Sequence, residues 1–237
     1  MSWRRYARLL SGLLGVLSTF GVSRAPAQGA SQDASRGCTR DGNDCSTHSA
    51  HRWNRSVWFA SALRPTVATR LGTTPFGLYE AGVRLSRKIL GSDVFAVSYV
   101  GDLVPLALAS NMSVGYNTEP CVQGGVAICT VAVRRTAAAT GVRPLGIDML
   151  LRRTGSVTVR ALATAGFLQF DYAVPDPEAR KLNFTASGGL ESAWDAGDRL
   201  RFELDLIREH ISNGATGRAN PGLNATMLVL GFGIFEL

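Results

Sequence analysis

The sequence has few charged residues, almost no lysine and no apolar run long enough to cross a membrane as a helix. Charged residues make up 18% of the 237 residues, and lysine occurs only at Lys88 and Lys181, so arginine carries most of the positive charge. The apolar stretch Leu9–Phe20 has 12 residues, whereas a membrane-spanning helix needs about 20. The composition is therefore unlike that of a typical charged soluble domain, and no membrane-spanning helix is predicted.

The first residues have the features of a secretory signal. Arg4, Arg5 and Arg8 lie around the start of the apolar stretch, and Ala25-Pro26-Ala27 fits the small-x-small rule for cleavage. We expect residues 1–27 to be a signal peptide, with a retained membrane anchor as the alternative. Cleavage would lower the formal charge from +7 to +3. Because no basic patch is interleaved with aromatic residues, nucleic acid is not an expected partner.

All four cysteines follow the predicted signal and fall into two closely spaced pairs. The spacing favours the disulfides Cys38–Cys45 and Cys121–Cys129 in an oxidising compartment, although four cysteines allow three pairings. The first pair, with two nearby histidines, could instead bind zinc, but its spacing matches no common zinc pattern. We therefore predict no metal and no other cofactor.

Residues 28–54 are rich in Gly, Ser, Asp and Arg and show no apolar period, which predicts an exposed N-terminal segment. From Arg55 onward, short segments with apolar character recur between turn signals, which predicts a β-barrel over residues 55–237. Each segment is near or above the roughly 10 residues of a tilted membrane strand. The eight predicted strands are 56–64, 76–88, 94–108, 141–152, 156–170, 181–193, 199–211 and 224–235.

The predicted connections alternate between short and long, which is typical of an outer-membrane barrel. The sequence therefore predicts an all-β, eight-stranded antiparallel transmembrane barrel in the cell outer membrane, with its long loops facing outward. A soluble periplasmic barrel or sandwich is the main alternative, and a homodimer is possible. The long loops are 65–75, 109–140, 171–180 and 212–223. Candidates for interfacial aromatic girdles are Trp53, Trp58, Phe59, Tyr79 and Trp194.

The last two predicted strands show the clearest alternation of side chains. Their apolar face should meet lipid, and their charged or small face should fill the lumen. The same parity carries His210, Ser212 and Asn224 to the lipid side, provided that no bulge intervenes. The expected lipid-facing residues are Leu200, Phe202, Leu204 and Leu206, followed by Leu228, Leu230, Phe232 and Ile234, and the expected charged lumen residues are Arg201, Glu203 and Asp205.

His210 is the only histidine of the predicted barrel, and Ser212 lies two residues after it. Residues two apart on a strand share a face with Cα atoms about 6–7 Å apart, so the two side chains can meet. A serine hydroxyl is a poor nucleophile and needs such a base. The simpler interpretation is an interfacial histidine beside a loop serine.

The segment from Glu209 to Asn224, EHISNGATGRANPGLN, resembles the lipid A 3-O-deacylase (PagL-like) family of outer-membrane enzymes. The hallmark of this family is a His-x-Ser-Asn segment on the penultimate strand, followed by a loop of the Asn-Pro-Gly type. The resemblance implies an eight-stranded barrel that removes an ester-linked 3-hydroxyacyl chain from lipid A of lipopolysaccharide, without metal or cofactor. It implies that Ser212 is the nucleophile and His210 the general base.

The resemblance also implies that Asn220, the backbone N–H of Ala215 and the neighbouring Asn213 hold the oxyanion or shape the site. The third catalytic member of the family is a glutamate, and its position here is Asn224. An amide can fix the histidine tautomer but cannot offset an imidazolium, so we expect a slower enzyme or one that uses another carboxylate. The simpler alternative is that Asn224 closes the loop as a turn residue.

Other carboxylates are poorly placed to replace the missing glutamate. Parity points Glu209 into the lumen, and the acids of the 171–178 loop, Asp171, Asp176 and Glu178, could reach the site only by folding over it. Arg208 and Arg218 are candidates for contacts with lipid A phosphates, or they are solvated surface arginines. Two functions remain open: a lipid A esterase, or a non-catalytic barrel that binds lipopolysaccharide or has a structural role. An open channel is disfavoured because side chains fill an eight-stranded barrel.

Overall fold

The computed structural model describes residues 53–69, 72–92, 94–120, 128–196 and 200–235. The predicted signal peptide and most of the predicted N-terminal segment lie outside these residues, so both stay predictions. Cys38, Cys45 and Cys121 also lie outside the described residues. Cys129 is not a free thiol, and its pairing with Cys121 also stays a prediction. In the described residues, no helix is long and apolar enough to cross a membrane.

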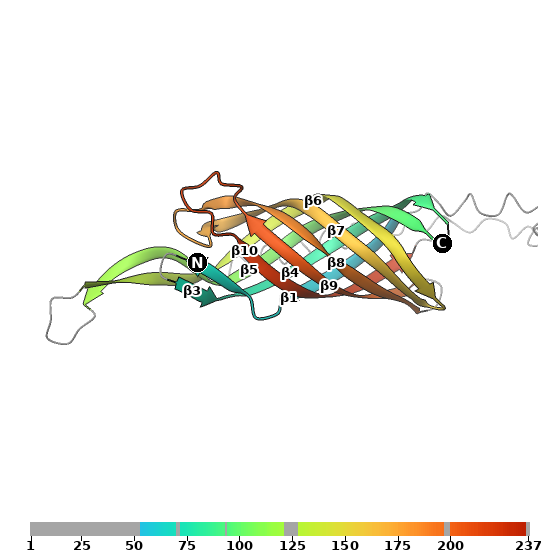
Figure 1. The fold of residues 1–237 in the computed structure, drawn as a ribbon, viewed down its shortest axis with the longest axis horizontal. Coiled ribbons are helices and arrows are strands. Elements are labelled where there is room, and N and C mark those ends of the chain that lie inside the picture. The colour runs from blue at the N-terminus through green and yellow to red at the C-terminus, as the bar shows by residue number, and fades with distance from the viewer. Residues whose placement is uncertain (1–52, 70–71, 93, 121–127, 197–199, 236–237) are drawn as a thin grey trace, which may run out of the picture. The chain divides into compact units, whose positions relative to one another are not determined.

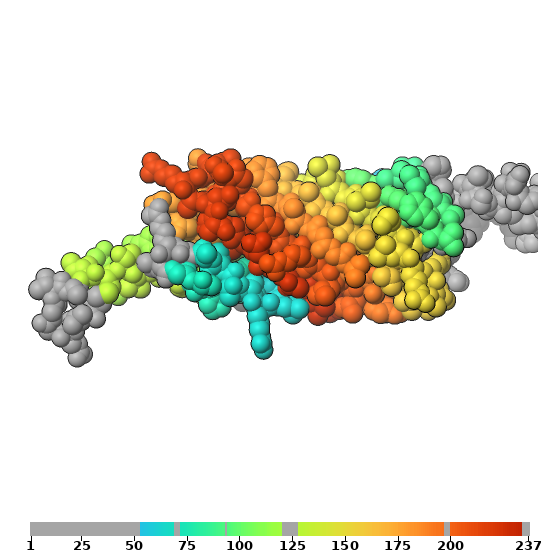
Figure 2. Space-filling view, in the orientation of Figure 1, coloured from blue at the N-terminus to red at the C-terminus, as the bar shows by residue number. Residues whose placement is uncertain are grey.

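Eight strands form a closed antiparallel ring, which confirms the predicted all-β fold (Figure 1). The ring runs β1-β4-β5-β6-β7-β8-β9-β10, and β10 pairs back to β1. In Figure 2, β1 (cyan) lies directly beside the C-terminal strands (red). A closed ring satisfies its backbone hydrogen bonds internally, as a membrane-spanning sheet must. The strands are β1 Trp53–Ala62, β4 Gly77–Gly91, β5 Ala96–Pro120, β6 Ile128–Thr154, β7 Val157–Val174, β8 Arg180–Ala196, β9 Leu200–Ser212 and β10 Leu223–Phe235.

The prediction of a loop over 109–140 was wrong in its extent. β5 and β6 continue as paired strands until Pro120 lies opposite Ile128, and Figure 1 shows this hairpin extending past the rest of the barrel. Four register shifts interrupt the β5–β6 pairing. Two of them, between Ala109 and Met112 and between Ser113 and Gly115, fall in the segment predicted as a loop. Each shift breaks the alternation of side chains between the two faces, so this segment lacks the sequence period of a strand although its backbone is paired.

The predicted 65–75 loop contains a small hairpin, β2 (Thr66–Thr69) and β3 (Gly72–Pro75). β2 pairs with β10 at a single position, where Thr66 lies opposite Asn224. The backbone N–H of Leu63 also donates to the carbonyl of Thr226 at 2.8 Å. The hairpin therefore extends the β1 side of β10 beyond the end of β1.

The side chains of β9 and β10 alternate as predicted. Arg201 and Asp205 are buried in the lumen, and the apolar residues between them point outward. Arg201 binds a carboxylate of the neighbouring strand, with its Nε 2.7 Å from Asp195. The exposed apolar side chains of these two strands are Leu200, Phe202, Leu204, Leu206, Leu228, Leu230 and Phe232.

Trp58 does not belong to an aromatic girdle, because it points into the lumen and is buried. Its ring lies across Gly82, its partner on β4, and a Cβ at Gly82 would sit 2.3 Å from the indole. The guanidinium of Arg143 lies over the same ring, 5.6 Å from its centroid. The other four girdle candidates are exposed, as predicted: Trp53, Phe59, Tyr79 and Trp194.

The lumen is packed with side chains, apolar in one part and charged in the other. Arg84 binds three carboxylates, those of Asp102, Asp205 and Glu191, at 2.9, 3.1 and 3.4 Å. An apolar cluster that includes Leu78, Met112, Leu168 and Met227 fills the barrel toward the long-loop end. Buried charges are tolerated where ion pairs and hydrogen bonds compensate them.

Candidate functional site

His210 and Asn224 face each other on the outside of the barrel, one on β9 and one on β10. The two residues are directly opposite in the strand register, and both side chains are exposed. The Nδ1 of His210 and the Oδ1 of Asn224 are 3.0 Å apart. In the tautomer that carries hydrogen on Nδ1, the imidazole donates to the amide oxygen and leaves Nε2 as a base. The outward orientation that parity predicted for both residues is therefore confirmed.

Ser212 is the last residue of β9 and lies half-buried, two residues beyond His210 on the same strand. Its partner on the neighbouring strand β8 is Phe184, an exposed aromatic residue that the sequence analysis did not place at the site. The Phe184 ring lies only 3.2 Å from where a Cβ of Gly214 would stand. An aromatic surface therefore lies beside Ser212 and beneath the first residues of the following loop.

Gly222 ends that loop and lies against the histidine. A Cβ at Gly222 would be 3.0 Å from Cε1 of His210, and its φ of 64° lies in the left-handed region. Both properties favour glycine, because a side chain would press on the imidazole and strain the backbone. The Pro-Gly part of the loop thus leaves room for His210 beside β10.

Asn213 organises the loop between β9 and β10, which spans residues 213–222. It is buried, and its Nδ2 donates to the carbonyl of Ala219 at 2.7 Å. Its backbone N–H donates to Oδ1 of Asn220 at 3.0 Å, and its carbonyl accepts the hydroxyl of Thr216 at 2.7 Å. The Asn220 oxygen is thereby used inside the loop, which leaves the amide nitrogen as the group that can donate to a ligand. Asn213 shapes the loop from within.

Ala215 has an unusual backbone conformation, with φ of 62°, and is exposed near the tip of the loop. A non-glycine residue in the left-handed region is uncommon and costs about 1–2 kcal/mol. Gly214 before it has a φ of 60°. Two successive residues of this kind turn the chain sharply after Ser212. The roles of Ala215 and Asn220 as oxyanion donors stay predictions.

Three of the four carboxylates considered as substitutes for the missing glutamate are bound elsewhere. Glu209 is buried and pairs with Arg143 at 2.5 Å, as its predicted orientation requires. Asp171 accepts the backbone N–H of Ala138 at 2.8 Å. Asp176 is buried, and its carboxylate accepts the hydroxyl of Tyr116. Asn224 is therefore the described side chain that lies within hydrogen-bond distance of the His210 ring.

Two arginines lie near this site. Arg208 is exposed on the same face as His210, one step further along the barrel, and donates to Oγ1 of Thr226 at 3.2 Å. Arg218 is exposed in the 213–222 loop. Both can reach an anionic group outside the barrel, and their predicted role in phosphate binding is untested.

A closed eight-stranded ring with an apolar outer face and a charged lumen defines a transmembrane β-barrel, here with polar side chains on its outer surface. Residues 151–233 match the family model described as Lipid A 3-O-deacylase (PagL). The match includes His210, Ser212 and Asn224, and it confirms the resemblance that the sequence predicted. The protein is an outer-membrane barrel, as predicted.

Three solved structures that are similar to this chain have low sequence identity to it. The outer membrane enzyme PagL is 14% identical over 74% of this chain and 97% of its own, with a TM-score of 0.47. Neisserial surface protein A is 7% identical over 78% of this chain and 97% of its own, with a TM-score of 0.41. Ail, the attachment invasion locus protein of Yersinia pestis, is 14% identical over 78% of this chain and 99% of its own, with a TM-score of 0.39. A search of the curated proteins gave no match.

Proposed function

We propose that the protein is an outer-membrane serine esterase that removes an ester-linked 3-hydroxyacyl chain from lipid A. The observation that carries this proposal is the His210–Asn224 pair on the outer surface of the barrel, with Nδ1 and Oδ1 3.0 Å apart. Ser212 follows His210 by two residues on the same strand. A polar group on a lipid-facing surface costs free energy unless it has a partner or a function. The family match over residues 151–233 supports the same chemistry.

In the proposed reaction, His210 acts first as a base and then as an acid. Its Nε2 takes the proton of the Ser212 hydroxyl while the serine oxygen attacks the ester carbonyl. The tetrahedral intermediate collapses to an acyl-enzyme, and the imidazolium protonates the departing sugar hydroxyl. Water, activated by the same histidine, then attacks the acyl-enzyme and releases the fatty acid, which restores the serine.

The 213–222 loop is the proposed source of the oxyanion donors. The Asn220 side-chain oxygen is bound inside the loop, so its NH2 group can donate outward, and the backbone N–H of Ala215 is the second donor. One such donor typically lowers the barrier by about 3–4 kcal/mol. The loop follows Ser212 directly, so nucleophile and donors belong to one short segment.

Asn224 can fill only one of the two roles of a catalytic carboxylate. Its Oδ1 can hold His210 in the tautomer that presents Nε2 to the serine. An uncharged amide does not stabilise the imidazolium that forms during the reaction, so we expect slow turnover. Arg208 and Arg218 are proposed to contact lipid A phosphates, because a guanidinium can bind a phosphate through two hydrogen bonds.

The test is the mass of lipid A in a bacterium that makes the hexa-acylated form and expresses this protein. Loss of one hydroxyacyl chain with the wild-type protein, and its retention with Ser212→Ala, is the expected result. Ser61→Ala is a control, because Ser61 is an exposed serine of β1 that lies opposite Leu228, four residues along β10 from Asn224. Deacylation that persists in Ser212→Ala would refute the proposed nucleophile.

A non-catalytic barrel is the second candidate, and the amide at Asn224 is the observation that favours it. Such a barrel would keep the fold and bind lipopolysaccharide or support the membrane. An unchanged lipid A mass, in cells whose barrel is folded and present in the outer membrane, would favour this candidate over the esterase.

A further inference from the structure

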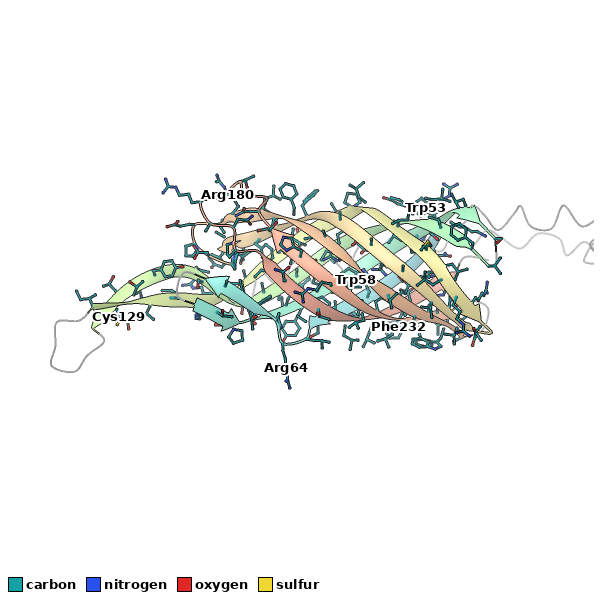
Figure 3. The ribbon with its side chains drawn as sticks, viewed as in Figure 1. Trp53, Trp58, Arg64, Cys129, Arg180 and Phe232 are labelled. Atoms are coloured by element: carbon teal, nitrogen blue, oxygen red, sulfur yellow. The ribbon has the colours of Figure 1, made fainter. Side chains whose placement is uncertain are left out.

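The connection between β7 and β8, residues 175–179, lies against the loop that carries the proposed oxyanion donors. The backbone N–H of Ala219 donates to the carbonyl of Glu178 at 3.3 Å. Nε of Arg180 donates to the carbonyl of Thr216 at 3.0 Å, and Figure 3 shows Arg180 at the same end of the barrel as the β5–β6 hairpin. A Cβ at Gly217 would stand 3.2 Å from the backbone of Ala179, so the two chains are in direct contact.

Asp176 anchors this connection from inside. It is 1% exposed, and its carboxylate accepts two hydrogen bonds, one from the Tyr116 hydroxyl and one from the backbone N–H of Glu178 at 2.9 Å. Its own carbonyl accepts the N–H of Ala179 at 2.9 Å. A buried carboxylate is costly without such donors, so its contacts strongly favour one arrangement of the connection.

Tyr116 belongs to the part of β5 that extends past the barrel, where it lies opposite Ala132 of β6. The backbone N–H of Ser113 in the same strand donates to the carbonyl of Pro175 at 3.3 Å. The projecting hairpin therefore holds the 175–179 connection through a side chain and through the backbone. This gives the hairpin a structural link toward the site.

The link continues into the loop after Ser212. Ala219 donates its N–H to Glu178, and its carbonyl accepts Nδ2 of Asn213 at 2.7 Å. The N–H of Asn213 in turn holds the oxygen of Asn220 at 3.0 Å. A series of hydrogen bonds thus leads from Tyr116 through Asp176 to a proposed oxyanion donor.

We propose that Asp176 is a positioning residue: held by Tyr116, it fixes the 175–179 connection against the 213–222 loop and so sets the positions of Ala215 and Asn220. This inference rests on the proposed function for its effect on the reaction. The geometry that it assigns to the loop can be measured without the reaction.

The first test compares Asp176→Ala and Asp176→Asn in deacylation of purified lipopolysaccharide by the full-length barrel. A donor displaced by about 1 Å can cost about a hundredfold in rate. We expect Asp176→Ala to lower kcat about 10- to 100-fold, with KM changed less than about threefold. Asp176→Asn should recover most of kcat, because an amide oxygen can still accept from Glu178 and its NH2 can donate to the Tyr116 oxygen.

Asp171→Ala is the matched control. Asp171 is also an acid near the long-loop end that accepts a backbone N–H, here from Ala138 of β6, and it is bound away from the 213–222 loop. An equal loss of kcat in Asp171→Ala and Asp176→Ala would overturn the inference. An unchanged kcat in Asp176→Ala would overturn it as well.

Tyr116→Phe tests the other end of the link. Tyr116→Phe should also lower kcat. The double variant should be no slower than Asp176→Ala alone, because both changes remove the same Tyr116–Asp176 hydrogen bond. Tyr172→Phe is its control, since the Tyr172 hydroxyl accepts from Arg135 at 3.3 Å and lies outside the link. Additive losses in the double variant would contradict the inference.

Trypsin gives a readout that needs no activity. Arg218 is exposed within the 213–222 loop, so cleavage after it reports how firmly the loop is held. We expect faster cleavage after Arg218 in folded Asp176→Ala than in wild type, Asp176→Asn or Asp171→Ala. If the wild-type protein proves inactive, the proposed function fails and this measurement alone decides the inference; equal cleavage rates in all four would overturn it.

Discussion

The two faces of β9 carry polar residues for different purposes, and the contrast is clearest at the neighbours Glu209 and His210. Glu209 points into the lumen, where it is fully buried and pairs with Arg143 at 2.5 Å. His210 points outward, is exposed, and has Asn224 3.0 Å from one ring nitrogen. The inner residue shares a cation with a second acid, Glu80, at 2.6 Å, whereas the outer residue keeps one nitrogen for a ligand.

The difference separates the contacts that hold the strands together from the contact assigned to the proposed reaction. The inner contacts join β4, β6 and β9 across the lumen, so they hold strands that are not neighbours in the ring. Removing one member would leave buried charges without compensation. The outer contact joins only adjacent strands, and the closed ring does not depend on it. Substitutions on the two faces should therefore change different quantities.

The largest effect is expected on activity from His210→Ala. In the proposed mechanism, loss of the base leaves the Ser212 hydroxyl with no proton acceptor, so the deacylation rate should fall by about 10⁴-fold or more. The free energy of unfolding should change by less than about 0.5 kcal/mol, because the side chain is exposed. Rates on purified lipopolysaccharide and unfolding in detergent measure the two quantities. A strongly destabilised His210→Ala barrel would break the proposed separation of the two faces.

The next effect is expected on stability from Arg143→Met. Arg143 lies between Glu80 and Glu209, so the variant leaves two buried carboxylates without their shared cation. The free energy of unfolding should fall by about 3–5 kcal/mol, whereas the rate per folded molecule should stay close to that of wild type. Arg153→Met is the control, since Arg153 is exposed at the other end of the barrel. Equal stability of the two variants would show that the lumen pairs do not hold the ring.

Sequence reasoning succeeded where the alternation of side chains was unbroken. The pairing of β9 with β10 runs from Leu223–Ile211 to Ile234–Leu200 without a register shift, so period alone gave the orientation of His210 and Asn224. The β5–β6 pairing has four shifts, two of them within 109–140, and that segment was wrongly predicted to be a loop. Trp58 lies between the exposed Val57 and Phe59 of β1, so it faces the lumen and the prediction of a girdle residue was wrong.

The candidate site was predictable only in the part that lies in one segment. His210, Ser212 and the following loop are contiguous, and the family resemblance gave Asn224. Phe184, Thr66 and Asp176 come from other strands or connections, and their closeness to the site depends on strand register and on loop packing. Those contacts involve residues far apart in the chain, so a single sequence does not specify them.

A smaller effect is expected from Asn224→Glu, which sharpens the contrast by giving the outer face a charged pair of its own. A hydrogen bond to a charged group contributes about 1–2 kcal/mol more than a neutral one, so deacylation should be about 5- to 30-fold faster. Asn224→Leu, which removes the partner of Nδ1, should be slower than wild type. An unchanged rate in both variants would show that Asn224 does not serve His210.

The smallest effect is expected from Arg208→Met, because Arg208 is exposed and its contact with Thr226 is formed at the surface. If the guanidinium binds a lipid A phosphate, losing it should raise KM about three- to tenfold and leave kcat almost unchanged, since an exposed ionic contact contributes about 1 kcal/mol. The same variant should show no rise in KM on lipid A from which the phosphates have been removed. Arg153→Met, at the far end of the barrel, should leave KM unchanged on both substrates. A rise in KM that persists without phosphates would mean that Arg208 contributes through packing of its stem along the outer face, as a surface arginine does.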